Sequence, residues 1–596
     1  SSGSSRVFSL SAPGSSALPS LAPAMGQACG SVGGKCLAYE PIGGSSEKLT
    51  ATVVPVNTGN SSFPPSQSNI TRAICVSGGG SRAMSFTLGI FRGLSECGLL
   101  SKFDSISTVS GGTWFASIFM FGKTYNGSEI STSEMLGKAA SPSELSMAVL
   151  NQEPAPIGAV MTRDSTLIAA QQAVTHKPEE LWQATIAKWL LEPFGLSSLE
   201  AFLAASESDK NRIVADNPIL ADKTFLTPRP DRPASFVMNG TWLAPVGYYA
   251  GADSAVALQV SPDWTGYPFY PNGEAVLYPL ACGYMCCPPS CRCLCSCCGA
   301  RMVVGGGFVE TFAFGGEAPA TSEQMGGRAA VGYPVGKPMS LAAAVGISSF
   351  AAGGKLEGSA VLGKTLNPQA VAWPVLDPSV QPGPQSALRY EYGDGGIVDN
   401  SGLLALLQRG ARKVVWIASS YVELSTSYDF AGATPATFDP YAADVVVQLY
   451  TAFGYPYNTL GYHQTHNQVF RKDRLLDVVR RIANMRDEGK PAVCSFNCEV
   501  LPNAWWGISG GFEVDVMLIY LTSVSNFEAA LPGDTKAELA KKTDGAFANF
   551  PIYSTVGNNG MTVNELGLTG CQINLLAAQG EYSVAQNAEA FQQLLS

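Results

Sequence analysis

Between residues 72 and 119 the hydrophobic pattern predicts two strands, each followed by a helix. A short apolar run at 73–76 is typical of a buried strand. From Arg82 onward the apolar residues recur at three- and four-residue steps, as they do along one face of a helix. A second strand is predicted at 104–109, and a second helix is expected to begin near Thr113. Because each strand gives way to a helix within a few residues, this stretch must contain two tight turns.

Strand and helix patterns alternate through the rest of the chain as well. Apolar runs at 413–417 and 514–522 predict strands, residues 403–409 predict a short helix, and residues 468–485 predict an amphipathic helix with a basic face. Residues 49–56 predict an edge strand. This alternation favours an α/β fold in which a mostly parallel central sheet is flanked by helices.

The chain divides into a tail and one large domain. Residues 1–48 are rich in Ser, Ala, Gly and Pro, and we expect them to be disordered. Residues 49–596 are expected to form a single domain. Within it, residues 126–387 show a mixed pattern with many Gly and Pro residues, which indicates a large insertion or cap carried on the sheet.

The composition is that of a globular protein, with 46% hydrophobic and 14% charged residues. The formal net charge is −10, which argues against a nucleic-acid partner because that function needs a basic face. No apolar run reaches the eighteen or so residues that a membrane span requires. The low charge still allows part of the surface to face lipid.

Eight of the 15 cysteines lie in a dense cluster at 282–298, inside the expected cap. Zinc sites favour cysteine pairs separated by a dozen or more residues, and this cluster is too dense for that pattern. Three interpretations stay open: a loop with no chemical role, a palmitoylated string that anchors the protein to a membrane, or a metal or disulfide site. The Met25-Gly26 sequence resembles an N-myristoylation signal, but Gly30 stands at the usual Ser/Thr position, so we favour an unstructured tail with a chance Met-Gly.

The two tight turns have compositions suited to chemistry. The run SGGG at 77–80 puts backbone N–H groups at the positive end of the following helix, which is a ready site for an oxyanion or phosphate. In the second turn two glycines follow Ser110. A serine on a strand-to-helix turn has the geometry of a nucleophile elbow, because small neighbours let the chain bend and leave Oγ exposed. Neighbouring elements could therefore supply an oxyanion hole and a nucleophile.

A second serine also lies between glycines. The literal motif G-x-S-x-G occurs at Ser509. No clear strand precedes Ser509 and a strand pattern follows it, so we interpret this segment as a turn. Ser110 has the context of an elbow, but Thr108 stands where the motif has its first glycine. The extra side chain could crowd the turn.

A nucleophilic serine needs a base, and the sequence offers two kinds. The order Ser110, Asp394, His463 suits a triad, yet His463 and His466 sit in a polar stretch typical of a solvated loop, and His176 is the third histidine of the chain. Asp394 follows a short strand pattern and precedes two glycines, so its carboxylate could accept the Ser110 proton directly. Asp-Gly is also a strong hairpin signal, and the sequence leaves these two interpretations of Asp394 open.

Three motifs together resemble one family. The sequences SGGGSRAM at 77–84, SGGTW at 110–114 and DGG at 394–396 are similar to those of the patatin and cytosolic phospholipase A2 group of lipid acyl hydrolases. The residues after the first glycine run and after the serine lean toward the cytosolic phospholipase A2 and fungal phospholipase B side. The long gap between serine and aspartate leaves room for a cap.

The resemblance implies a Ser–Asp dyad that works without histidine, metal or cofactor, with Ser110 as the nucleophile and Asp394 as the base. It also implies an oxyanion hole formed by the backbone N–H groups of Gly78, Gly79 and Gly80, and a substrate phosphate bound by Arg82. The implied enzyme is a phospholipase A2 or lysophospholipase that cleaves fatty-acyl esters of glycerophospholipids or lysophospholipids. The alternative is a catalytically inactive patatin-like subunit that binds lipid or holds a membrane complex, and Thr108 is its best support.

The same resemblance implies a cytoplasmic protein that associates peripherally with a membrane, its phospholipid or lysophospholipid source. Contact with the membrane could come from the apolar cap, the basic helix at 468–485 or acylated cysteines. The sequence leaves a secretory route open, as well as the head group, the acyl position and the oligomeric state.

Overall fold

The protein is described by a computed structural model. The tail at 1–45, with its Met25-Gly26 sequence, and the cysteine cluster at 282–298 lie outside the described residues. These comprise residues 46–55, 70–246, 255–267, 275–279, 299–303, 307–319, 327–351, 366–373, 375, 387–459, 462–553 and 566–596.

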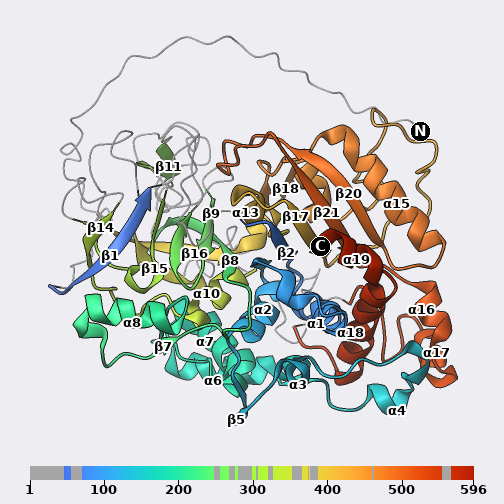
Figure 1. Cartoon of the computed structure of the whole chain (residues 1–596), viewed down its shortest axis with the longest axis horizontal. Coiled ribbons are helices and arrows are strands. Elements are labelled where there is room, and N and C mark those ends of the chain that lie inside the picture. The colour runs from blue at the N-terminus through green and yellow to red at the C-terminus, as the bar shows by residue number, and fades with distance from the viewer. Residues whose placement is uncertain are drawn as a thin grey trace, which may run out of the picture. The chain divides into compact units, whose positions relative to one another are not determined.

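A large mixed sheet runs through the fold, and its centre is parallel (Figure 1). Five adjacent strands form the parallel block: β8 (Ser235–Pro245), β3 (Ser105–Val109), β2 (Arg72–Val76), β17 (Lys413–Ala418) and β21 (Phe512–Tyr520). On both sides of this block the pairing is antiparallel. The prediction of a mostly parallel sheet therefore holds for the block and is wrong for the sheet as a whole. Where short turns replace helical crossovers, neighbouring strands must run in opposite directions.

Part of the region expected to be a cap is built into the sheet. Strand β8 pairs with β3, and β9 (Val256–Val260), β10 (Trp264–Tyr267) and β13 (Gly307–Glu310) continue outward from it. Residues 126–387 therefore do not form a cap alone. Strand β1 (Lys48–Pro55) pairs on both sides, with β13 and β14 (Arg328–Gly332), so it is not the edge strand that its pattern suggested. A strand's own sequence does not show how many of its edges are paired.

The helices that carry the two chemical turns lie side by side. Helix α1 (Gly80–Glu96) packs against α2 (Gly111–Phe121) and against α18 (Gly570–Ala585), and Figure 1 shows the C-terminal helices next to α1. A Cβ atom at Gly89 would overlap the backbone of Ala577, so this helix crossing needs a glycine. A buried ion pair between Arg92 and Glu581, with N and O 3.3 Å apart, joins α1 to α18.

The other predicted helices both form, although the amphipathic one begins seven residues later than expected. The short helix is α13 (Leu403–Gln408), and the amphipathic helix is α15 (Leu475–Asp487). The basic face of α15 already has acceptors, because Arg480, Arg481 and Arg486 donate to the carbonyls of Phe430, Ser495 and Leu424. Among the helices described, none has both the length and the apolar composition needed to cross a bilayer.

Candidate active site

Ser110 occupies a strained turn between β3 and α2. Its backbone has φ 52° and ψ −120°, an uncommon conformation for a residue with a side chain. The two glycines after it are needed for space, because a Cβ atom at Gly111 would overlap the Gly80 backbone and one at Gly112 would lie 2.8 Å from the Val76 carbonyl oxygen. The turn therefore has the geometry of a nucleophile elbow.

The sheet brings Asp394 to Ser110. Strands β3 and β16 (Leu388–Asp394) lie end to end along one edge of β8, and the other edge of β8 pairs with β9. On the shared edge Asn239 of β8 pairs with Val109, and the next residue, Gly240, pairs with Asp394. The ends of β3 and β16 consequently meet, and Ser110 Oγ donates a hydrogen bond of 2.8 Å to Asp394 Oδ2. After Asp394 the chain enters a 3-10 turn (Gly395–Ile397), so Asp-Gly does not form a hairpin here.

The Asp394 carboxyl is tuned toward neutrality. It is buried, and this burial raises its pKa from 3.8 to about 7. Two hydrogen bonds oppose the rise, one from the Gly396 N–H at 2.7 Å to Oδ1 and one from Ser110. A carboxyl that titrates near pH 7 and touches a serine hydroxyl is suited to general-base chemistry.

Backbone N–H donors lie beside the serine, but not all of those expected. The Gly78 N–H donates to the Asn400 carbonyl at 3.2 Å, so it is already committed. Gly80 and Gly111 are the first residues of α1 and α2, where no carbonyl of the same helix can accept their N–H groups. Neither N–H has an acceptor in the described part of the chain. A Cβ atom at Gly111 would lie 2.6 Å from the Gly80 nitrogen, so the two helix N-termini adjoin.

Gly111 has an open N–H beside Ser110 that the sequence analysis did not name as a donor. The signal was available, because an elbow commonly uses the N–H of the residue after its nucleophile. The sequence predicts that the N–H groups of Gly78, Gly79 and Gly80 all hold the oxyanion. For Gly78 this is wrong, because its N–H already donates to the Asn400 carbonyl. Gly79 has φ 140°, a conformation that favours glycine and that shapes the loop into α1.

Arg82 is a buried cation in the first turn of α1. Its side chain is 5% exposed, and Nη1 donates to the Tyr553 carbonyl at 2.6 Å. Its Nε is buried without a partner, and Arg82 forms no ion pair with a carboxylate of the described residues. Burial lowers the pKa of Arg82 to about 10, so the guanidinium stays charged at neutral pH. Such a cation is suited to an anionic ligand.

These groups share one cavity of about 510 Å³, a size typical of ligand sites. Among the described residues that line it, the ionisable side chains are the cation Arg82, the acid Asp394 and three tyrosines, Tyr421, Tyr457 and Tyr462. The rest is neutral: Ala351, Asn400, Val447, Gln464, Asn549 and Ile552, with glycines 78–80 and 396. Burial raises the pKa of Tyr421 to about 12, so this phenol is uncharged at neutral pH.

The histidines do not line this cavity. In β19 (Tyr462–Gln464), Tyr462 and Gln464 line it, and strand alternation turns His463 to the opposite face. His463 Nδ1 lies 3.4 Å from Asn458 Oδ1, and the His466 ring stacks on Trp505 at a centroid distance of 5.3 Å. His176 Nδ1 bonds to Thr175. The order Ser110, Asp394, His463 therefore does not correspond to a spatial triad.

Thr108 does not disturb the elbow, and Ser509 does not form a second one. Thr108 lies in β3, fully buried, and its Oγ1 is 2.9 Å from Thr113 Oγ1, so the side chain is accommodated without crowding the elbow. Ser509 lies in a turn between an isolated bridge at Ile508 and β21, and Gly510 and Gly511 both have positive φ. Ser509 is thus part of a glycine turn that leads into a strand.

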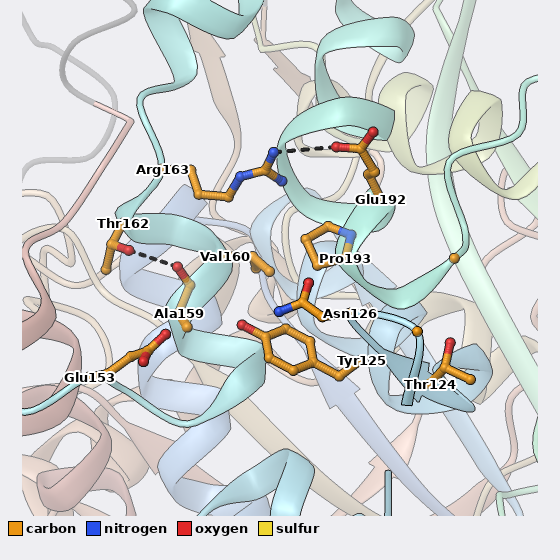
Figure 2. A pocket seen from close by; sticks show the side chains of 12 residues that line it. Thr124, Tyr125, Asn126, Glu153, Ala159, Val160, Thr162, Arg163, Glu192 and Pro193 are labelled. Atoms are coloured by element: carbon orange, nitrogen blue, oxygen red, sulfur yellow. Dashed lines mark hydrogen bonds and ion pairs between the residues drawn. The ribbon is translucent and has the colours of Figure 1, made fainter. Parts of the chain in front are cut away.

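Figure 2 shows a second pocket, of about 590 Å³, near the Tyr125-Asn126 turn. Two of its three charged side chains, Arg163 and Glu192, pair with each other, and the third, Glu153, is exposed. Arg163 pairs with Glu192 at 3.4 Å and donates to the Lys188 and Trp189 carbonyls. It holds no pair of nucleophile and base comparable with Ser110 and Asp394. Nowhere in the described ranges do three or more His, Cys, Asp or Glu side chains gather in a way that could hold a metal ion.

Comparison with known proteins gives only distant likenesses. No family model matches the chain, and no curated protein matches it. Among solved structures, human GIVD cytosolic phospholipase A2 is 13% identical over 88% of this chain and 60% of its own, with a TM-score of 0.38. The same human protein in complex with methyl gamma-linolenyl fluorophosphonate and terbium chloride gives 13% identity, 88% and 59% coverage, and a TM-score of 0.37. The chain thus spans about 60% of the length of these structures, and at such scores its chemistry has to be argued from its own site.

Proposed function

We propose that the protein is a serine acyl hydrolase that cleaves fatty-acyl esters of glycerophospholipids or lysophospholipids. The observation that carries the proposal is the 2.8 Å hydrogen bond from Ser110 Oγ to Asp394 Oδ2 at the wall of a cavity. The N–H groups of Gly80 and Gly111 lie beside that bond. A nucleophile, a base and preorganised donors are the three parts that acyl transfer needs.

The reaction follows from these positions in two steps. Asp394 takes the Ser110 proton as Oγ attacks the ester carbonyl, and the N–H groups of Gly80 and Gly111 stabilise the negative charge that develops on the carbonyl oxygen. Asp394 then gives the proton to the departing alcohol, which leaves an acyl-serine. In the second step Asp394 takes a proton from water and the resulting hydroxide attacks the acyl carbonyl. The bond from the acyl carbon to Ser110 Oγ then breaks, the fatty acid leaves, and Asp394 returns the proton to Oγ.

The phospholipid preference rests on Arg82. A buried guanidinium without a carboxylate partner attracts an anion, and the phosphate of a phospholipid would meet its free donors beside the reacting serine. We further propose that the protein takes its substrate at a membrane surface without spanning the membrane. Tyr421, which lines the cavity and is 48% exposed, belongs to a residue type that favours such interfaces.

An inactive lipid-binding subunit is the alternative. Its main argument was that Thr108 would crowd the elbow, and the buried hydrogen bond of Thr108 to Thr113 removes that argument. The two functions differ in whether Ser110 reacts covalently.

The test is covalent labelling combined with acyl release. An alkyl fluorophosphonate should label Ser110, as identified by peptide mass, and the purified full chain should release fatty acid from phosphatidylcholine or its lyso form in the presence of EDTA. A chain that binds these vesicles but neither takes up the label nor releases acid would favour the lipid-binding subunit instead.

Replacing Arg82 by glutamine is expected to separate phospholipid from neutral ester substrates. Glutamine keeps a donor for the Tyr553 carbonyl but loses the charge. Since a hydrogen bond to a charged group contributes about 1.5–3 kcal/mol, kcat/KM for a phospholipid should fall about 10- to 100-fold, whereas a neutral p-nitrophenyl ester should change about threefold or less. Arg92→Gln is the matched control, because Arg92 is buried on the same helix but faces Glu581. Equal losses on both substrates in Arg82→Gln would show that Arg82 has only a structural role.

A further inference from the structure

Behind the elbow, three buried hydroxyl groups form a continuous chain. Thr108 Oγ1 lies 2.9 Å from Thr113 Oγ1, and Thr113 Oγ1 lies 2.9 Å from Ser348 Oγ. Ser348, near the end of α10 (Leu341–Ser348), lies 2.7 Å from the Asn239 carbonyl oxygen. The backbone N–H of Ser110 points to the same Ser348 oxygen at 3.1 Å. Three segments distant in the sequence, at 108–113, 239 and 348, thus converge behind the proposed nucleophile.

Counting protons sets the direction of this chain. A carbonyl oxygen only accepts, so the single proton of Ser348 goes to Asn239. The Ser348 oxygen must then accept from the Ser110 N–H and from the Thr113 hydroxyl. Thr113 has no second proton, so it accepts from Thr108 at 2.9 Å, which is shorter than the 3.4 Å contact of Thr108 Oγ1 with the Val237 carbonyl oxygen. All three hydroxyls donate in one direction, from Thr108 through Thr113 and Ser348 to the Asn239 carbonyl. The Ser110 N–H donates to the last of these hydroxyl groups, that of Ser348.

The Ser110 backbone needs such support. Its positive φ is a strained conformation that persists only where the surroundings hold it. Because the Ser110 N–H bonds to Ser348, it is not available as an oxyanion donor, and its hydrogen bond instead fixes the peptide that carries Oγ. Losing this bond would free the peptide plane to turn and would move Oγ away from Asp394.

The chain ends on the strand that also holds the base. Asn239 belongs to β8, and two residues further along β8 the Thr241 hydroxyl donates to the Asp394 carbonyl oxygen at 2.7 Å. The Asn239 side chain in turn donates to the Thr108 carbonyl at 2.9 Å. One strand therefore sets the backbone positions of both Ser110 and Asp394.

We propose that Thr113 and Ser348 are positioning residues that hold the Ser110 backbone in its reactive conformation and so preserve the contact between Oγ and Asp394. The kinetic side of this inference rests on the proposed hydrolase function. The alternative is that these hydroxyls only satisfy one another in the core, with no effect on the serine beyond general stability.

The variants Ser348→Ala and Thr113→Val remove single hydroxyls at little change of volume, and Thr113→Ser restores one. Ser349→Ala is the matched control. Ser349 is the next residue in the sequence and is also buried. Its hydroxyl donates to the Val345 carbonyl and accepts from the Trp182 indole, and it makes no hydrogen bond to Thr108, Thr113 or Ser348. Thermal stability is measured for every variant, so that changes in rate are compared at similar losses of stability.

We expect Ser348→Ala and Thr113→Val to lower kcat for acyl release by about 10- to 100-fold with KM changed about threefold or less, since a small misplacement of a reacting group has effects of this size. The rate of fluorophosphonate labelling should fall in parallel. Ser349→Ala should keep kcat, and Thr113→Ser should recover most of it. If Ser348→Ala and Thr113→Val lose no more activity than Ser349→Ala, or if Thr113→Ser is as impaired as Thr113→Val, the inference is overturned.

Amide hydrogen exchange of the full chain gives a readout independent of activity. The peptide that contains Ser110 should exchange faster in Ser348→Ala and Thr113→Val than in wild type or Ser349→Ala. Unchanged exchange in both variants would overturn the inference even if the hydrolase function holds. A wild type that neither labels nor releases acid would instead overturn the hydrolase function, while exchange would still decide whether these hydroxyls hold the Ser110 backbone.

Discussion

Ser110→Ala and Asp394→Asn are each expected to lower the rate of acyl release by at least about four orders of magnitude, because residues of a nucleophile and base pair act as a unit. Alanine removes the atom that forms the acyl-enzyme. Asparagine keeps the shape of the aspartate and its place beside Ser110 but cannot accept the proton. The measurement is single-turnover release of fatty acid from phosphatidylcholine and from its lyso form, with fluorophosphonate labelling in parallel.

The double variant His463→Ala/His466→Ala is the control for this prediction. Neither histidine lines the cavity, and one of them stacks on Trp505, so release should stay within about threefold of wild type, the range expected for residues away from the reaction. An equally inactive histidine variant would mean that a histidine reaches the serine during the reaction, and the dyad mechanism would be wrong. The double variant Ser110→Ala/Asp394→Asn should be no slower than either single variant.

The second large effect concerns stability: Asp394→Asn, which should lose activity, should raise the free energy of unfolding at alkaline pH. Burial raises the pKa of Asp394 from 3.8 to about 7, so the folded protein holds this proton more tightly than the unfolded chain does. The stability that this difference contributes is complete below the unfolded pKa and is lost as the pH rises through about 7. At pH 8 the loss corresponds to roughly 4 kcal/mol. Asn never carries the charge, so Asp394→Asn should be the more stable protein at alkaline pH.

Urea unfolding at pH 5 and pH 8 checks this. The stability gained by Asp394→Asn over wild type should be larger at pH 8, with less than half of the gain remaining at pH 5 because wild type then keeps most of the proton. Ser110→Ala is the control: it loses activity but keeps the buried carboxyl and the Gly396 bond, so it should follow the pH dependence of wild type. Parallel curves for Asp394→Asn and wild type would show that Asp394 titrates near its ordinary pKa. The site would then gain nothing from burying its base.

The strand-to-helix units are features that the sequence determines by itself. The strands at 72–76 and 105–109 and the helices after them follow from local periodicity, and they appear within two residues of the expected positions. The sharp turn at Ser110 is also determined locally, because it needs the two glycines that follow Ser110 in the sequence. A turn of this kind needs small residues at fixed offsets, and such residues can be recognised in a sequence.

The partner of Ser110 was decided by the tertiary structure. The sequence alone allowed two interpretations of Asp394, a catalytic base or part of a hairpin turn. Asp394 lies 284 residues after Ser110. The two meet because β3 and β16 pair end to end with consecutive stretches of one edge of β8, while β9 pairs with the other edge. Strand register depends on hydrogen bonds between distant segments, and local pattern does not specify them. For the same reason the mixed pairing of the sheet and the inclusion of β8 in it could not be predicted.

The tertiary structure likewise decided which polar groups are already hydrogen-bonded or paired. The glycine run names three candidate N–H donors, but the carbonyl that occupies Gly78 comes from Asn400, and Gly111 from the other turn provides an open one. Arg82 could be recognised as a cation at a helix start, whereas its lack of a carboxylate partner and its contact with Tyr553 depend on the far end of the chain. The sequence therefore determined which residues could do chemistry, because that depends on residue type and local bending. The tertiary structure decided which of them are free, buried and close enough to act together, because those properties depend on neighbours that folding brings from hundreds of residues away.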